Sequence, residues 1–174
     1  MHYIYHAVPE KMIGNNLIPL NSMQDIDDSL RNSYMSKYRG REDILERKIP
    51  ILDCLWNDVV QLLPIHPQKI FELQKRLGFL QVVPNYRFYK INLSLLDRKH
   101  AVVFFKSSPG EDNIVVKLLG DVDFDAIQQI PRATVDYYKS VRKTNELPFN
   151  YQFVPHILYK GEVNISSAEI ITLS

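Results

Sequence analysis

Histidine is the residue type in this chain best suited to chemistry, and two of its histidines stand in segments that are typical of β-strands. His6 lies within residues 3–8, an aromatic and β-branched run that Pro9 ends, and His156 opens residues 156–159. An imidazole on an inner strand must find a hydrogen-bond partner. His6 is therefore predicted to be either a satisfied, half-buried side chain or a polar group that holds a ligand. The residues alone leave both interpretations open.

The spacing of the histidines argues against a metal site. His2 and His6 are the pair closest in sequence, and four residues along a strand separate two side chains by about 13 Å, too far to share one zinc ion. His100 follows an Asp-Arg-Lys sequence and is expected in a solvated turn. His66 precedes Pro67 and is expected at the start of a helix. No metal cofactor is predicted.

Two arginines flank a glycine in the sequence Tyr38-Arg39-Gly40-Arg41. A guanidinium group holds a phosphate or carboxylate through two parallel hydrogen bonds. Tyr38, Arg39 and Arg41 are therefore candidate cofactor-binding residues. The alternative interpretation is a charged junction between two helices.

Cys54 is the single cysteine, so a disulfide within the chain is impossible. Its neighbours are mostly apolar, which favours a small core residue over a nucleophile. Trp56, the single tryptophan, is interpreted as a core residue, with a stacking platform as the alternative.

Familiar catalytic motifs are missing from the sequence. It has no glycine-rich phosphate loop, no GxSxG, no HExxH and no CxxC pair. Because the chain contains only 6 glycines, a dinucleotide-binding Rossmann unit is not expected either.

The length and the charge of the chain limit which classes of protein it can belong to. A chain of 174 residues predicts one domain, residues 1–174, that folds without a metal or disulfide. The 21 Lys+Arg against 20 Asp+Glu argue against a protein built mainly to bind nucleic acid or an acidic membrane. The sequence shows no signal peptide and no apolar run of about 20 residues, so a cytoplasmic protein without a membrane partner is expected.

The order of the expected elements predicts an α+β fold with a mixed, largely antiparallel central sheet and flanking helices. Strands are expected at residues 3–8, 86–93, 101–106, 114–118, 156–159 and 169–173. Helices are expected at 68–77 and at 123–142, the latter interrupted near Pro131, with shorter helices starting near residue 10, within 23–40 and over 41–48. Residues 51–63 suit a strand and a helix equally well.

Both ends of the chain resemble the ADP-ribosyltransferase-like fold. Tyr5-His6-Ala7-Val8-Pro9, Met12-Ile13-Gly14 and Leu17-Ile18-Pro19-Leu20 are similar to its first motif, a strand with an aromatic-His-x-Thr element, a short helix and a G-L-x-P turn. This opening is also similar to that of the DNA ADP-ribosylating toxins. Residues 155–163 and 168–171 look like the closing pair of strands.

This resemblance implies an ADP-ribosyltransferase-like protein that binds NAD or an ADP-ribose-like group and, if it is a transferase, modifies a macromolecule. His6 would bind the ribose, and His156 would be the catalytic residue, although the family has a glutamate there. Val8 replaces the usual Thr or Ser, another departure from the family motif.

The whole chain also resembles a family of small bacterial proteins that share the strings YHAVP, GRE and CLWNDV, a likeness that implies no particular activity. The alternative to an enzyme is a non-enzymatic protein-interaction or effector module. Nucleic-acid binding is a weaker third hypothesis.

Overall fold

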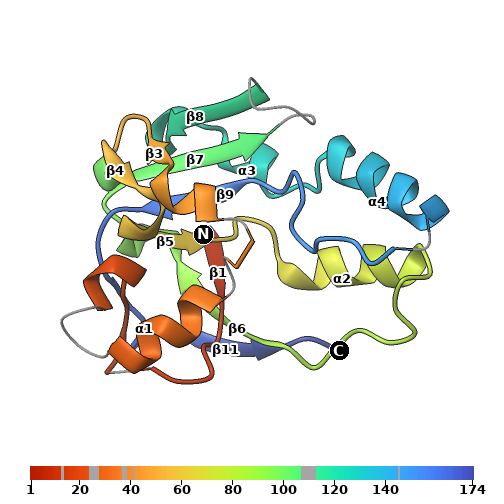
Figure 1. The fold of residues 1–174 in the computed structure, drawn as a ribbon, viewed down its shortest axis with the longest axis horizontal. Helices are drawn as coiled ribbons and strands as arrows, with labels where there is room; N and C mark the ends of the chain where they lie inside the picture. The colour runs from red at the N-terminus through yellow and green to blue at the C-terminus, as the bar shows by residue number, and fades with distance from the viewer. Residues whose placement is uncertain (13, 24–27, 37–38, 41, 107–112, 145) are drawn as a thin grey trace.

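Antiparallel strands form the framework of the protein (Figure 1). The computed structural model describes residues 1–12, 14–23, 28–36, 39–40, 42–106, 113–144 and 146–174. A three-stranded sheet has the order β1-β6-β11, and a four-stranded sheet has the order β5-β9-β7-β8. The strands are β1 (Tyr3–Ala7), β6 (Arg87–Asn92), β11 (Glu169–Thr172), β5 (Val60–Leu62), β9 (His156–Tyr159), β7 (Ala101–Lys106) and β8 (Ile114–Leu118).

An isolated bridge joins the two sheets. The main-chain N–H and C=O of Tyr5 exchange two hydrogen bonds of 2.8 Å with those of Leu63, just beyond β5. Two short antiparallel pairs complete the β-structure: β2 (Asn16–Leu17) with β10 (Val163–Asn164), and β3 (Lys48–Ile49) with β4 (Cys54–Leu55).

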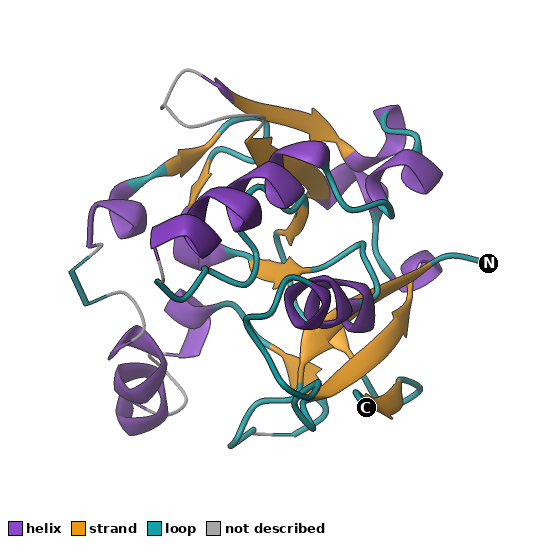
Figure 2. Ribbon diagram, turned by 90° about the vertical axis from the view of Figure 1, so that its right-hand side faces the viewer, coloured by secondary structure: helices purple, strands orange, loops and turns teal. Residues whose placement is uncertain are grey.

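Helices pack against both sheets, and α2 and α4 lie together on one side of them (Figures 1 and 2). The α-helices are α1 (Asp28–Met35), α2 (Pro67–Arg76), α3 (Phe124–Ile127) and α4 (Arg132–Thr144). Short 3-10 helices are η1 (Leu20–Met23), η3 (Glu42–Glu46), η4 (Trp56–Asp58), η5 (Leu93–Leu95), η6 (Arg98–His100) and η8 (Leu119–Asp121). No helix in these described ranges has the length and apolar character needed to cross a bilayer.

Local chemistry explains where α2 begins and ends. His66 is its N-cap, and the Nδ1 atom accepts a hydrogen bond of 3.2 Å from the Gln68 N–H. Pro67 occupies the first helical position, where a missing N–H costs nothing. Gly78, at φ +80°, ends the helix in the left-handed conformation that glycine adopts most easily. The predictions of a helix here and of His66 at its start are confirmed.

Two apolar clusters use opposite faces of the sheets. One face packs Ile4, Leu62, Ile91, Val103 and Ile157, all fully buried, into a core that spans both sheets. The other face packs under α2 and α4, where the buried residues are Tyr5, Leu63, Ile65, Ile70, Phe71, Leu73, Phe88, Tyr138, Val154 and Leu173. Alternate residues of β1 therefore face different clusters, as the two-residue period of a strand requires.

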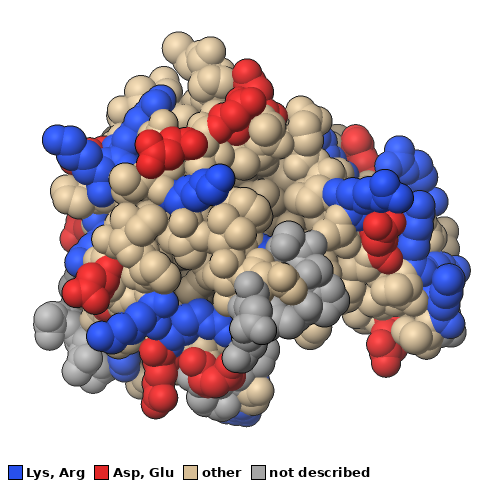
Figure 3. Space-filling view, turned by 90° about the horizontal axis from the view of Figure 1, so that it is seen from above, with Lys and Arg blue, Asp and Glu red and all other residues tan. Residues whose placement is uncertain are grey.

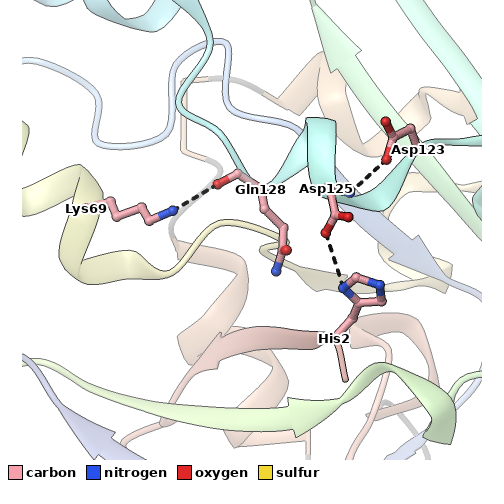
Figure 4. Close-up of polar contacts among 5 residues, drawn as sticks. All are labelled: His2, Lys69, Asp123, Asp125 and Gln128. Carbon is pink, nitrogen blue, oxygen red and sulfur yellow. Dashed lines mark hydrogen bonds and ion pairs between the residues drawn. The ribbon is translucent and has the colours of Figure 1, made fainter.

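Polar contacts tie α3 to the start of β1 and to α2 (Figure 4). Asp123 caps α3 by accepting a hydrogen bond of 3.0 Å from the Asp125 N–H. The Asp125 carboxylate lies 3.7 Å from Nδ1 of His2, and Nζ of Lys69 donates to the Gln128 carbonyl at 3.4 Å. The Asp125 side chain is 80% exposed, so its contact with His2 orients the helix more than it stabilises the fold.

Several expected elements differ from the structure. The strands lie in two sheets instead of one central sheet, and their pairing is antiparallel throughout the described strands. Of the helix expected over 41–48, the described residues 42–48 contain the short η3 and the start of β3 instead, and the described residues 10–12 are not helical. Residues 51–63 contain β4, η4 and β5, so the strand alternative describes them better.

Cys54 is buried, as predicted, beside Ile49, Leu52, Val102 and Leu158. Burial raises the pKa of its thiol, which keeps it protonated and unreactive. We expect a thiol reagent to label the native protein far more slowly than the urea-unfolded protein, and Cys54→Ser to retain every ligand response of the wild type. Equal labelling rates in the two states would contradict this structural role.

Candidate ligand-binding site

A cavity of about 380 Å³ opens where the two sheets separate. β1 and β5 supply one part of its wall, and the segment that runs from Val8 to Met23 supplies another. Its described lining residues are Tyr5, His6, Ala7, Val8, Pro9, Lys11, Met12, Asn16, Leu17, Ile18, Leu20, Met23, Tyr34, Asn57, Val59, Val60, Gln61, Leu63, Phe88, Tyr151 and His156. This volume is within the range of small-molecule sites.

The cavity exists because β1 and β5 diverge beyond their single bridge. If the antiparallel register of Tyr5 and Leu63 continued, Ala7 would face Gln61, but among the described residues the ladder stops at the bridge. Successive residues of a strand turn their main-chain N–H and C=O groups to opposite sides. Those of His2 and Val8 turn toward β6, so those of Ala7 turn toward β5. Main-chain groups of Ala7 and Gln61 are thus directed at the cavity instead of at each other.

His6 lies on β1 beside this opening. Its Nδ1 is 2.6 Å from the carbonyl oxygen of Ala7, so the proton of a neutral ring belongs on Nδ1 and Nε2 is the acceptor. The same contact occupies one lone pair of the Ala7 carbonyl. Of the two main-chain groups of Ala7, the N–H is therefore the one that a ligand can use most directly, as a hydrogen-bond donor.

His156 occupies the opposite end of the chain but borders the same cavity. Its Nδ1 lies 2.9 Å from the Val154 carbonyl oxygen, which again places the proton on Nδ1 and leaves Nε2 as an acceptor. Burial lowers the pKa of His156, so the imidazole is neutral at pH 7. Although protein surrounds the ring, the residue retains accessible surface where it borders the cavity.

The two histidines approach the opening from different faces of the β-structure. Continuing the β5–β9 register pairs Leu63 with His156, and Leu63 also pairs with Tyr5, so these three side chains share one face. His6, next to Tyr5, points to the other face. The strands that carry the two histidines, β1 and β9, are two strand spacings or about 10 Å apart. A ligand inserted between the sheets would have one imidazole on each side.

Tyr151 stands next to His156, with ring centroids 6.3 Å apart at an interplanar angle of 90°. Burial raises the pKa of its hydroxyl, so the phenol is a neutral donor and acceptor. No hydrogen-bond partner of this hydroxyl occurs among the described residues. Tyr151 therefore adds a polar group to the His156 end of an otherwise apolar cavity.

Asn57 is a further cavity residue, and the sequence did not single it out. It is 4% exposed, and its Oδ1 has no hydrogen-bond partner in the part of the chain that the structure describes. A polar Asn-Asp pair between the apolar residues 54–56 and 59–60 was the signal that could have drawn attention to it, but a buried and a solvated asparagine look alike in sequence.

The charge of the lining favours a neutral or anionic ligand. Lys11 is the charged side chain among the described lining residues, and none of those residues is acidic. The ligand class is therefore one with hydrogen-bonding groups inside the cavity and with either no charge or a negative charge beside Lys11.

The predicted arginine clamp is only partly placed. Arg39 is exposed and is not among the described residues that line the cavity. Tyr38 and Arg41 lie outside the described residues. The role of this segment in phosphate binding stays a prediction.

Charges of both signs are mixed on the face seen in Figure 3, with Lys and Arg more frequent at its right-hand end, where α4 lies. The basic residues of that helix are Arg132, Lys139, Arg142 and Lys143. Nucleic-acid binding stays the weaker hypothesis that the net charge of +1 indicated.

No family model matches the chain, and neither a curated protein nor a solved structure does. Function is therefore inferred from the cavity and its residues.

Proposed function

We propose that this cavity binds a nucleotide of the ADP-ribose type, either NAD or ADP-ribose, in an ADP-ribosyltransferase-like fold. The observation that carries the proposal is the meeting of His6 and His156, from opposite ends of the sequence, at one cavity between two sheets. These are the positions that the family resemblance assigns to ribose binding and to the catalytic residue.

The polar groups of the cavity suit such a ligand. The neutral imidazole of His156 offers its Nε2 as an acceptor to a ribose hydroxyl, and the main chain of Ala7 and Gln61 can pair with the edge of a carboxamide or a base. Lys11, exposed at the cavity, can meet phosphate as a positive point charge. The cavity volume of about 380 Å³ accommodates part of a dinucleotide, with its remainder at the mouth.

We do not expect this protein to transfer ADP-ribose efficiently. Cleavage of NAD at its nicotinamide ribose builds positive charge on the sugar, which a carboxylate stabilises. His156 is a neutral imidazole and cannot supply fixed negative charge, and the described lining residues include no carboxylate. We therefore expect this protein to bind the nucleotide but to cleave NAD slowly.

Thermal unfolding with added ligand tests the proposal. At 100 times its Kd, a ligand stabilises the native state by about 2.7 kcal/mol, which raises the Tm of a chain of this size by roughly 5–10 °C. We expect this shift with NAD and with ADP-ribose, and its loss in His6→Ala without loss of the folded state. His100→Ala is the matched control, because His100 is exposed on η6 outside the described cavity lining.

Calorimetric titration decides the opposite outcome. If NAD and ADP-ribose both give no heat and no thermal shift with folded wild-type protein, nucleotide binding is rejected. The interaction-module hypothesis then stands ahead of it.

A further inference from the structure

We infer that Asn57 is a specificity-determining residue of this cavity, whose side-chain carbonyl accepts a hydrogen bond from the exocyclic amino group of a bound adenine. This inference rests on the proposed nucleotide binding and names the chemical group that the site selects.

Asn57 has a buried side-chain oxygen that accepts no hydrogen bond from the described residues. Its side chain is 4% exposed and its Oδ1 has no partner among the described residues, whereas most buried polar atoms are paired. An unsatisfied buried group of this kind costs about 1–3 kcal/mol. A protein that retains this cost beside a cavity has a polar group held ready for a ligand.

The neighbours of Asn57 fix its backbone. Asp58 accepts a hydrogen bond of 2.7 Å from the Leu55 N–H and another of 2.7 Å from Nδ2 of Asn21. On the other side, the ring of Trp56 packs edge-on against Phe104 at 5.2 Å between centroids. Because both adjacent residues are anchored, the Asn57 amide moves mainly by rotation about its own side-chain bonds.

The identity of the free end follows from Met35. Nδ2 of Asn57 lies 3.5 Å from Sδ of Met35, and a thioether sulfur can only accept a hydrogen bond. The amide nitrogen therefore faces the sulfur, and the free end is the carbonyl oxygen. Since the last torsion of asparagine is broad, turning this oxygen toward the cavity costs little beyond a weak contact to sulfur. The ligand group that satisfies it must be an N–H or O–H donor.

The surroundings of Asn57 suit a flat aromatic base. The bond from Asn21 to Asp58 places η1 next to η4, and Met35 belongs to α1. Leu20 and Met23 of η1 and Tyr34 of α1 line the cavity together with Asn57. The histidines line the cavity beside the bridge, since His6 follows Tyr5 in β1 and His156 continues the register opposite Leu63. An adenine among Leu20, Met23 and Tyr34 would present its amino group as the donor.

Affinity for two dinucleotides tests this selection. Nicotinamide hypoxanthine dinucleotide differs from NAD by having a carbonyl acceptor in place of the adenine amino group. We expect wild-type protein to bind NAD roughly tenfold or more tightly than this analogue, because a mispaired acceptor costs about one hydrogen bond. In Asn57→Ala, NAD should bind about tenfold more weakly and the ratio of the two affinities should fall close to one.

Asn16→Ala is the matched control. Asn16 lines the same cavity, but its Nδ2 donates to Glu162 at 2.8 Å and its Oδ1 accepts from Asn164 at 3.0 Å. This amide is already paired within the protein, so its removal should leave the affinity ratio as in wild type.

Asn57→Leu supplies a readout without ligand. Replacing a buried amide whose oxygen has no partner among the described residues with an apolar group of similar size relieves the desolvation penalty of that oxygen at the loss of a weak contact to sulfur, and we expect the Tm of the free protein to rise by roughly 2–4 °C. A lower Tm together with an unchanged affinity ratio in Asn57→Ala would identify a structural amide and overturn the inference.

The outcomes separate the two proposals. Equal affinities of wild type for NAD and its hypoxanthine analogue would overturn the role of Asn57 and leave nucleotide binding in place. Binding of neither dinucleotide would overturn both.

Discussion

Replacing Tyr138 with alanine is expected to lower the free energy of unfolding by about 3–5 kcal/mol, as for other large buried aromatic residues. Tyr138 is fully buried on α4, and its ring lies 6.2 Å from that of Phe79 and 5.7 Å from that of Tyr137. Because α2 packs on the same cluster, the resulting cavity would lie between two helices that cannot collapse independently. Urea unfolding followed by circular dichroism measures the loss.

Tyr138→Phe separates the hydroxyl from the ring. The hydroxyl donates to the Asn150 carbonyl and accepts a hydrogen bond of 3.1 Å from Nε2 of Gln74. Burial raises the pKa of Tyr138 to about 12, so the phenol is neutral at any pH used for the measurement. Its removal leaves a buried amide and a carbonyl without this partner, and we expect a loss of about 1–3 kcal/mol.

Tyr86→Phe is the matched control for this hydroxyl. Tyr86 also packs its ring on the same cluster, at 5.4 Å from Phe71, but it is 51% exposed. Its phenylalanine variant should unfold within about 0.5 kcal/mol of wild type. If the two Tyr→Phe variants are equally stable, the buried hydroxyl contributes nothing.

The Tyr138 network also connects the fold to the cavity. The Tyr138 hydroxyl donates a hydrogen bond to the Asn150 carbonyl, and Oγ1 of Thr134 donates one of 3.0 Å to the Gln152 carbonyl. Side chains of α4 therefore hold the residues on both sides of Tyr151 in the chain. Tyr151 lines the cavity next to His156. The stability of α4 therefore determines how firmly this end of the site is held.

The strands were predictable because their signal is local. Residues 101–106, 114–118 and 156–159 are rich in β-branched and aromatic residues between turn signals, and the structure has strands with these bounds. The separation into two sheets was not predictable. It depends on the pairing of β1 with β5 stopping, among the described residues, at the bridge between Tyr5 and Leu63, and no periodicity within either segment specifies where such a pairing ends.

The candidate site shows the same difference between features set by local sequence, which were predictable, and features set by contacts between distant segments, which were not. His6 and His156 were noticeable as polar residues in strand-like runs, and both line the cavity. Asn57 was missed because its Oδ1 is left without a hydrogen-bond partner among the described residues only once η4, α1 and η1 are packed together. Arg39 was singled out from its neighbours in sequence, yet it is exposed away from the described lining, since local composition does not place a loop in space.

Acid is expected to destabilise the protein through His156. Burial lowers the pKa of this imidazole in the folded state, while the unfolded chain titrates near the ordinary value of about 6.5. As the pH falls below about 6.5, the unfolded state binds the proton first, so the free energy of unfolding falls. The slope is at most about 1.4 kcal/mol per pH unit and ends once the pH is below the folded pKa. Above about pH 7, His156 should make no pH-dependent contribution.

Urea unfolding between pH 7.5 and about 5, in wild type and in His156→Gln, measures this contribution. His66 also has a pKa lowered, first by burial and then by Lys69, so the variant should retain part of the acid sensitivity and lose the rest. His100→Gln is the matched control, because His100 is exposed and lies 3.3 Å from Asp97. If His156→Gln and wild type lose stability in parallel as the pH falls, the imidazole at position 156 is not the buried neutral group. Its assignment as a hydrogen-bond acceptor in the cavity would then fail as well, because a protonated ring has no lone pair to offer.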